Sequence, residues 1–220
     1  MRDYEVLNIV LKYELYLLAH LIFHSKNHYL NLHTGGLIMK KIITGILTVC
    51  SLSVLAEELP PEVNKMIPAL KAWGANPVLI DAVKNQNAKN ISLDAIKARD
   101  ASWRKTEGLD DEMKGMLSSA AGKKLSEFEK SQPYFFELFL MDNQGANVSM
   151  TNKTSDYWQG DEAKWQESFK GGAGAVHIGE IEFDESAQDY LVQVSVPVVD
   201  GGKAIGAITI GINLDDLEAK

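Results

Sequence analysis

Cysteine and histidine are scarce in this sequence, and their scarcity excludes several kinds of site. The single cysteine, Cys50, lies in an apolar run near the start, so residues 57–220 can form neither a disulfide nor a thiolate metal site. Four of the five histidines precede residue 39, which leaves His177 as the one imidazole farther along. A zinc site or a Ser-His-Asp triad there has at most one candidate histidine. We interpret His177 as a strand residue with a satisfied ring, and we expect no metal and no cofactor.

Basic residues are outnumbered by acidic ones. The chain has 22 Lys and Arg against 30 Asp and Glu, a net charge of −8. Residues 1–56 hold five of the basic and three of the acidic residues, so the rest of the chain has 17 and 27, a net charge of −10. This balance repels nucleic acid and anionic membrane surfaces, and we expect neither as a partner. Residues 57–220 have the size of one domain, which buries roughly 70% of its unfolded surface.

A run of about 20 apolar residues, as a membrane-spanning helix needs, is missing near residue 39. Instead, MKKIITGILTVCSLSVLAEELPPEV begins at Met39 with two lysines, continues with the apolar run 42–55 and reaches small residues before two glutamates. These are the three parts of a secretory signal peptide. We expect residues 39–56 to be that peptide, with cleavage after Ala56, and a retained membrane anchor is the alternative.

Residues 1–38 precede this start-like segment. They are leucine-rich, but Lys12 and Glu14 interrupt the apolar sequence, which makes the segment a poor membrane span. We hypothesise that translation starts at Met39 and that residues 1–38 are a non-native upstream extension. A cytoplasmic or membrane-lying extension is the alternative. Mass spectrometry decides between them, because any cellular peptide from residues 2–38 refutes the hypothesis.

The hydrophobic period changes once along the rest of the chain. Residues 57–132 follow a period of about 3.6, with helix starts predicted at Asn76-Pro77, at Ser92 and at Asp110 or Asp111, and a break or kink at Gly122. After Pro133 the period becomes two, which is typical of strands. The predicted strands are 134–141, 146–151, 175–183, 190–199 and 205–212, with a short helix at 161–170. We therefore predict an α+β domain in which one antiparallel sheet of five strands is backed by the N-terminal helices.

Two stretches carry a resemblance to a known family. LFLMDNQGANVSMTNKTSDYWQGDEAKWQESF, followed by EFDESAQDYLVQVSVPVVDGGKAIGAITIGINL, resembles the Cache domains, PAS-like extracytoplasmic sensors of bacterial chemoreceptors and sensor kinases. NPVLIDAVKNQNAKN and ISLDAIKARDASWRKTEG resemble the helical lead-in of small single-Cache proteins. The resemblance implies a PAS-like sheet over residues 133–220. It also implies a ligand pocket under an insertion at 152–170.

The resemblance also implies which residues hold the ligand. In many Cache domains a basic residue two places before a tryptophan holds a carboxylate, and an aspartate after the third strand holds an amine. Here Ala163 takes the first place, with Lys164 directly before Trp165, while Asp184 matches the aspartate. Together with aromatic rings that can wall a pocket and polar strand positions that can line it, the ligand-binding candidates are Tyr157, Trp158, Lys164, Trp165, Asp184 and Ser195.

Five of these six candidates also have a structural interpretation. Trp158 and Trp165 could pin the insertion to the sheet, Lys164 could be a solvated helix residue, and Asp184 could belong to a turn. Ser195, with Gln193 and Thr209, could reflect strand alternation alone.

We expect a free periplasmic sensor that captures a small metabolite such as a carboxylate, an amino acid or an amine. Closure of the insertion would shift its conformational populations, and a membrane chemoreceptor or sensor kinase would receive its bound state. After signal cleavage we expect no membrane insertion. One alternative is an envelope scaffold or partner-binding protein without a ligand. A less favoured one is a hydrolase that uses Glu180, Glu182 and Asp184, three carboxylates predicted on one strand face.

Overall fold

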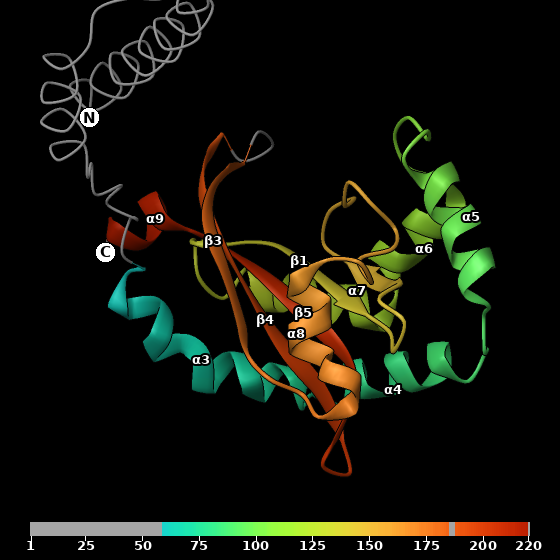
Figure 1. Cartoon of the computed structure of the whole chain (residues 1–220). Helices are drawn as coiled ribbons and strands as arrows, with labels where there is room; N and C mark the ends of the chain where they lie inside the picture. Colours follow the sequence, from blue (N-terminus) through green and yellow to red (C-terminus); the bar gives the residue numbers. More distant parts are fainter. Residues whose placement is uncertain (1–58, 185–187, 220) are drawn as a thin grey trace, which may run out of the picture. The chain divides into compact units, whose positions relative to one another are not determined.

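The computed structural model describes residues 59–184 and 188–219 (Figure 1). By its internal contacts the chain divides into two units, Met1–Leu55 and Ala56–Lys220, and every described residue belongs to the second. The predicted signal peptide and the segment 1–38 lie outside the described residues. Within the described ranges, none of the helices is long and apolar enough to cross a membrane.

Within the described residues five helices precede the sheet. Four of them start after a side-chain cap, and the first starts after Pro60 without one. Asn76 accepts a hydrogen bond from the backbone N–H of Val78, and Ser92 and Asp110 cap their helices in the same way. These caps confirm the predicted helix starts. The helices are α3 (Pro61–Gly74), α4 (Pro77–Asn87), α5 (Leu93–Trp103), α6 (Asp111–Ser118) and α7 (Ala120–Glu129).

The predicted break near Gly122 lies three residues earlier. Ser119 has an extended backbone and caps α7, its side chain accepting a hydrogen bond from the backbone N–H of Gly122. A Cβ atom on Gly122 would lie 2.3 Å from the carbonyl oxygen of Met116 and 2.4 Å from that of Leu117. The glycine therefore lets the chain turn sharply between α6 and α7.

The five strands form one antiparallel sheet in the order β2-β1-β5-β4-β3. Their bounds lie within two residues of the predicted ones. This confirms the α+β class with a PAS-like five-stranded sheet. The strands are β1 (Phe135–Met141), β2 (Asn147–Met150), β3 (His177–Asp184), β4 (Asp189–Asp200) and β5 (Lys203–Asn213), and the short helix α9 (Leu214–Glu218) follows β5.

The sheet separates two hydrophobic cores. Leu138 and Leu140 of β1 join the first core with side chains from α3, α4 and α7, whereas Phe139 and Met141 join the second core. This division follows from the period of two, because successive strand residues face opposite sides. The second core also contains side chains of α5 and α6, so the N-terminal helices contribute to both faces rather than to one. The sequence did not predict this division.

The insertion between β2 and β3 carries the short helix α8 (Ala163–Phe169) and a 3-10 turn, η2 (Lys170–Gly172). Helix α8 packs against β3, β4 and β5 (Figure 1). Lys170, Gly171 and Gly172, which form η2, all have positive φ angles. Through α8 the insertion covers one face of the sheet.

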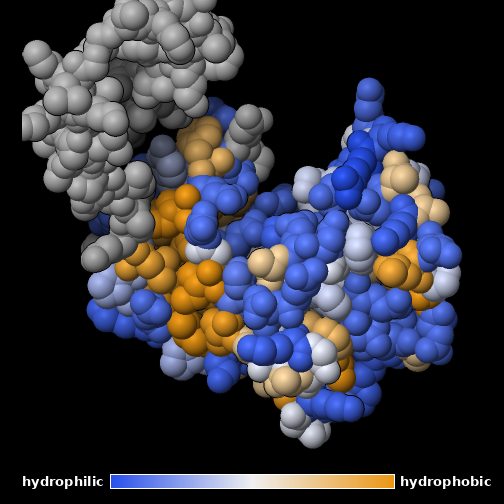
Figure 2. Space-filling model, in the orientation of Figure 1, coloured by the Kyte–Doolittle hydropathy of each residue, from blue (hydrophilic) through white to orange (hydrophobic). Residues whose placement is uncertain are grey.

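Strand β3 lies at an edge of the sheet and presents hydrophobic side chains to the surface. Figure 2 shows hydrophobic surface along β3 and α3, in contrast to the hydrophilic surface around α8. At the far end of β3, Phe183 and Tyr190 pack edge to face with ring centroids 5.5 Å apart, and 52% and 47% of these residues are exposed.

Candidate ligand-binding site

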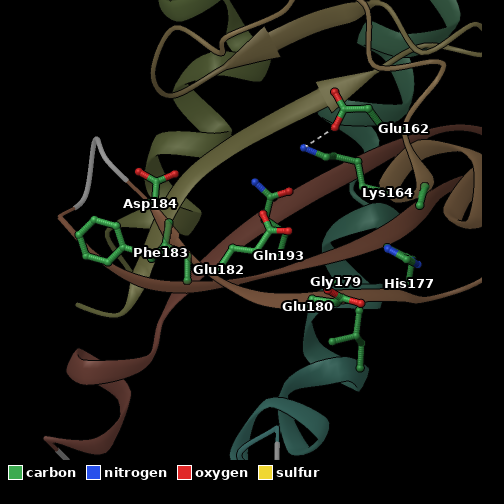
Figure 3. Close-up of a pocket in the computed structure, with 12 residues that line it drawn as sticks. Glu162, Lys164, His177, Gly179, Glu180, Glu182, Phe183, Asp184 and Gln193 are labelled. Atoms are coloured by element: carbon green, nitrogen blue, oxygen red, sulfur yellow. Dashed lines mark ion pairs between the residues drawn. The ribbon is translucent and has the colours of Figure 1, made fainter. Parts of the chain in front are cut away.

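Two adjoining cavities lie between the sheet and the insertion. The larger has a volume of about 500 Å³ and the smaller a volume of about 290 Å³. Lys164, Gln193 and Asp184 line both. Figure 3 shows Lys164, paired with Glu162, on one side of Gln193 and Asp184 on the other. Together these volumes suit a small metabolite.

A glycine beside Gln193 leaves space on β3. Gly179 of β3 has no side chain, and a Cβ atom there would be 3.4 Å from the Gln193 carbonyl oxygen. On the other side Gln193 of β4 pairs with Gly211 of β5, where the carbonyl oxygen of Phe136 takes the place of a side chain. Gln193 lines both cavities, although it was noted in the sequence only as a polar strand residue.

Lys164 is the basic group shared by both cavities. Its Nζ lies 2.9 Å from Oε2 of Glu162 and 5.6 Å from the ring centroid of Phe139, and its side chain is 21% exposed. Lys153 lines the smaller cavity, but its Nζ donates to the carbonyl oxygen of Thr106 at 2.6 Å. Lys164 is therefore held over the sheet rather than extended into solvent.

Glu137 lines the smaller cavity, and the sequence analysis missed it. Its carboxyl group is largely buried, and this burial, together with repulsion from Asp184, raises the pKa of Glu137 to about 7. The attraction of Lys164 acts in the opposite direction and lowers the pKa. The signal that could have found it is a single carboxylate in the apolar strand FFELFLM.

Acidic groups predominate around the two cavities. The lining residues include His177, two lysines (Lys153 and Lys164) and five acids: Glu137, Glu162, Glu180, Glu182 and Asp184. The three carboxylates that the sequence placed on one strand face do line one cavity, the larger one. Among the described residues, no group of three His, Cys, Asp or Glu side chains is arranged to hold a metal ion.

The three aromatic candidates lie elsewhere. Tyr157 is 3% exposed and packs in the second core, with its ring centroid 5.5 Å from that of Trp103. The indole N–H of Trp158 donates to the carbonyl oxygen of Gln144 at 2.8 Å, and that of Trp165 donates to Asp142 at 3.0 Å. Both acceptors belong to the β1–β2 turn. The two tryptophan geometries match the interpretation that these rings pin the insertion. None of the three aromatic residues is among those that line the two cavities.

Ser195 is fully buried and hydrogen-bonded within the sheet. Its hydroxyl lies 2.7 Å from that of Thr209 on β5, and Thr209 is also fully buried. Helix α8 packs against both strands that carry these residues. Their polar groups therefore satisfy each other, and Ser195 is not among the residues that line the two cavities.

Asp100 of α5 ties the insertion to the helical part of the domain. Its Oδ1 accepts hydrogen bonds from the backbone N–H groups of Tyr157 at 2.9 Å and Trp158 at 3.1 Å. Its Oδ2 lies 2.7 Å from Arg104, which also contacts Asp156 at 3.0 Å. This contact fixes the loop that leads into α8, and hence the wall of the pocket.

Comparisons with known proteins give structural neighbours only. No protein-family model matches the chain, and no curated protein does. The sensor domain of the V. cholerae histidine kinase DctB is 12% identical, and the match covers 72% of this chain and 52% of that domain's chain, with a TM-score of 0.42. The sensory domain of the Campylobacter jejuni chemoreceptor Tlp3 is 15% identical, with 71% and 64% coverage and a TM-score of 0.38. The ligand-binding domain of the Pseudomonas aeruginosa PAO1 amino acid chemoreceptor PctC, in complex with GABA, is 11% identical, with 71% and 63% coverage and a TM-score of 0.33.

All three neighbours are sensor or ligand-binding domains of a histidine kinase or a chemoreceptor. This chain covers between 52% and 64% of their length. At these identities the likeness concerns the fold and says nothing about the ligand of this chain.

Proposed function

We propose that this protein is an exported sensor that captures a small metabolite between its sheet and its insertion. One observation carries the proposal: two adjoining cavities, of about 500 and 290 Å³, share Lys164, Gln193 and Asp184. A few convergent polar groups in a concave site are the usual form of a small-molecule pocket. The metabolite class includes carboxylates, amino acids and amines, because the shared residues offer a cation, an amide and a carboxylate.

In the periplasm, this protein would pass its bound state to a membrane receptor. The signal-peptide pattern at 39–56 supports export, and the resemblance to Cache sensors supports a chemoreceptor or a sensor kinase as the receiving partner. Lys164 and Asp184 are the ligand-binding residues that we carry forward from the sequence, and Gln193 joins them. We assign no catalytic residue.

A thermal-shift screen of the purified protein against amino acids, short carboxylates, amines and purines tests this proposal. A ligand at a hundredfold excess over its Kd adds about 2.7 kcal/mol of stability, which for a domain of this size raises the Tm by about 5–10 °C. Gln193→Ala should reduce the shift, because it removes the amide from the floor of both cavities. Glu167→Gln, an exposed change on α8, is the matched control and should keep the shift.

The opposite result is also informative. If no compound shifts the Tm of a protein that melts cooperatively, the small-molecule function fails. The envelope scaffold or partner-binding role then becomes the better explanation.

A further inference from the structure

Glu137 differs from the other acids of the pocket in how the backbone places it. Phe136 pairs with Gly211 of β5 and Leu138 pairs with Ile210, so Glu137 is an extra residue without a partner in that strand. Its φ angle is +47°, in the left-handed region that residues other than glycine rarely adopt. A β-bulge of this kind redirects a side chain. Here Glu137 lines the smaller cavity.

Side chains from two other elements hold this bulge. The carboxylate of Glu129, at the end of α7, accepts a hydrogen bond from the backbone N–H of Glu137 at 3.1 Å and from the hydroxyl of Thr151 at 2.6 Å. The Thr151 hydroxyl in turn accepts from the backbone N–H of Leu138 at 3.0 Å. The backbone amides of the bulge are thus satisfied by side chains, and the position of Glu137 is fixed before any ligand binds.

The Glu137 carboxyl group has charged neighbours on each side but no bond to them. Glu129 of α7 and Asp184 of β3 repel its charge, and Lys164 of α8 attracts it. Lys153, on the loop that follows β2, lines the same cavity. Within residues 59–184 and 188–219, the carboxyl group forms no hydrogen bond or ion pair. It is therefore a largely buried acid that faces a cavity and has room for a partner there.

We propose, building on the function proposed above, that Glu137 determines ligand specificity by holding an ammonium group, and that it releases a proton when it does so. A ligand carboxylate is the alternative occupant of the smaller cavity. It would lie against two other acids, Glu137 and Asp184, while the nearby Lys164 is already paired with Glu162 at 2.9 Å. An ammonium ion instead supplies the positive charge that a buried carboxylate needs as a partner.

The exchange balances in atoms and charge. The neutral Glu137 carboxylic acid and the ammonium ion become a carboxylate–ammonium pair, and the proton passes to the buffer. Burial raises the pKa of Glu137 to about 7, so at pH 6 the carboxylate that the cation needs is scarce and at pH 8 it predominates. The affinity for an amine should therefore rise about tenfold between pH 6 and pH 8, and binding at pH 7 should release about half a proton per ligand.

The experiment compares two matched series, straight-chain amines from ethylamine to hexylamine and carboxylates from acetate to hexanoate. Thermal shifts at pH 8 and pH 6 identify binders, and isothermal titration calorimetry of the best amine in phosphate and in Tris buffer measures the released proton. Glu137→Gln keeps the shape of the side chain but removes its charge, and its Tm without ligand reports whether it folds. Glu167→Gln removes an exposed charge from α8 and is the matched control.

We expect an amine to stabilise the wild type and the Glu167→Gln variant at pH 8, with about tenfold weaker binding at pH 6, and Glu137→Gln to lose both the binding and its pH dependence. Carboxylates that bind the wild type and Glu137→Gln equally would overturn the inference while the proposed function stands. An absence of any shift with the amines also overturns it. In that case the broader metabolite screen shows whether the proposed function survives.

Discussion

Replacing Glu137 with glutamine, without any ligand, should stabilise the protein at alkaline pH and change little at acid pH. Burial raises the pKa of Glu137 from its ordinary 4.5 to about 7. The native state therefore favours the protonated carboxyl. The stability that this preference contributes is full below the unfolded pKa and is lost as the pH rises through the native pKa. Glutamine has no proton to lose, so the variant avoids that loss.

The size of the effect follows from the two pKa values. The interval between 4.5 and about 7, at about 1.4 kcal/mol per pKa unit, corresponds to about 3 kcal/mol at pH 8. For a domain of this size that difference corresponds to about 6–12 °C in Tm. At pH 4 the difference should fall to a few tenths of a kcal/mol, because the carboxyl group is then mostly protonated in both states.

Urea denaturation of both proteins at a series of pH values from 4 to 8 measures this difference. Burial also raises the pKa of Asp142 and of Asp156. These groups change the stability of both proteins in the same way, so the difference between the two curves isolates Glu137. Glu167→Gln provides the control for removal of an exposed charge. A difference that stays constant with pH would refute the reasoning, because it would mean that Glu137 ionises as an ordinary glutamate.

Three further changes test the framework around the pocket. Asp100→Ala leaves the buried amide of Tyr157 and the partly buried amide of Trp158 without an acceptor, and urea denaturation should show a loss of about 3 kcal/mol of stability. Asp81→Ala, an exposed change on α4, should cost little stability. In Gly211→Ala the new Cβ atom would lie 2.3 Å from the Phe136 carbonyl oxygen, and the substitution should lower the free energy of unfolding by about 2–3 kcal/mol. Gly115→Ala, at an exposed helix position with open space, should instead raise it by about 0.5–1 kcal/mol. Ser195→Ala leaves the Thr209 hydroxyl unpaired and should lower the free energy of unfolding by about 1 kcal/mol. A thermal-shift assay should show that any ligand-induced rise in Tm is unchanged.

The elements of this fold could be predicted because their signals are local. The caps at Asn76, Ser92 and Asp110 lie within three residues of the groups that they bind. The change to a period of two at residue 133 depends only on the next few residues. The split of the helices between two cores was not predicted, because it depends on contacts between α5, α6 and the insertion that are distant in the sequence.

The pocket could be predicted only in part. Lys164 and Asp184 do line both cavities, although their binding roles stay predictions. The aromatic residues were chosen for their chemistry. The direction of each tryptophan ring, however, depends on which carbonyl its indole N–H reaches, and these carbonyls belong to a distant turn. Glu137 reaches the cavity through a bulge that Glu129 and Thr151 hold. No single stretch of sequence contains that arrangement.

The contacts of the insertion also bear on how a ligand could change the structure. Closure of the insertion, which the sequence suggested, would break the indole hydrogen bonds of Trp158 and Trp165 and the amide hydrogen bonds to Asp100. At about 1 kcal/mol each, these bonds oppose that motion with several kcal/mol, which a ligand would have to supply as a difference in affinity between the two states.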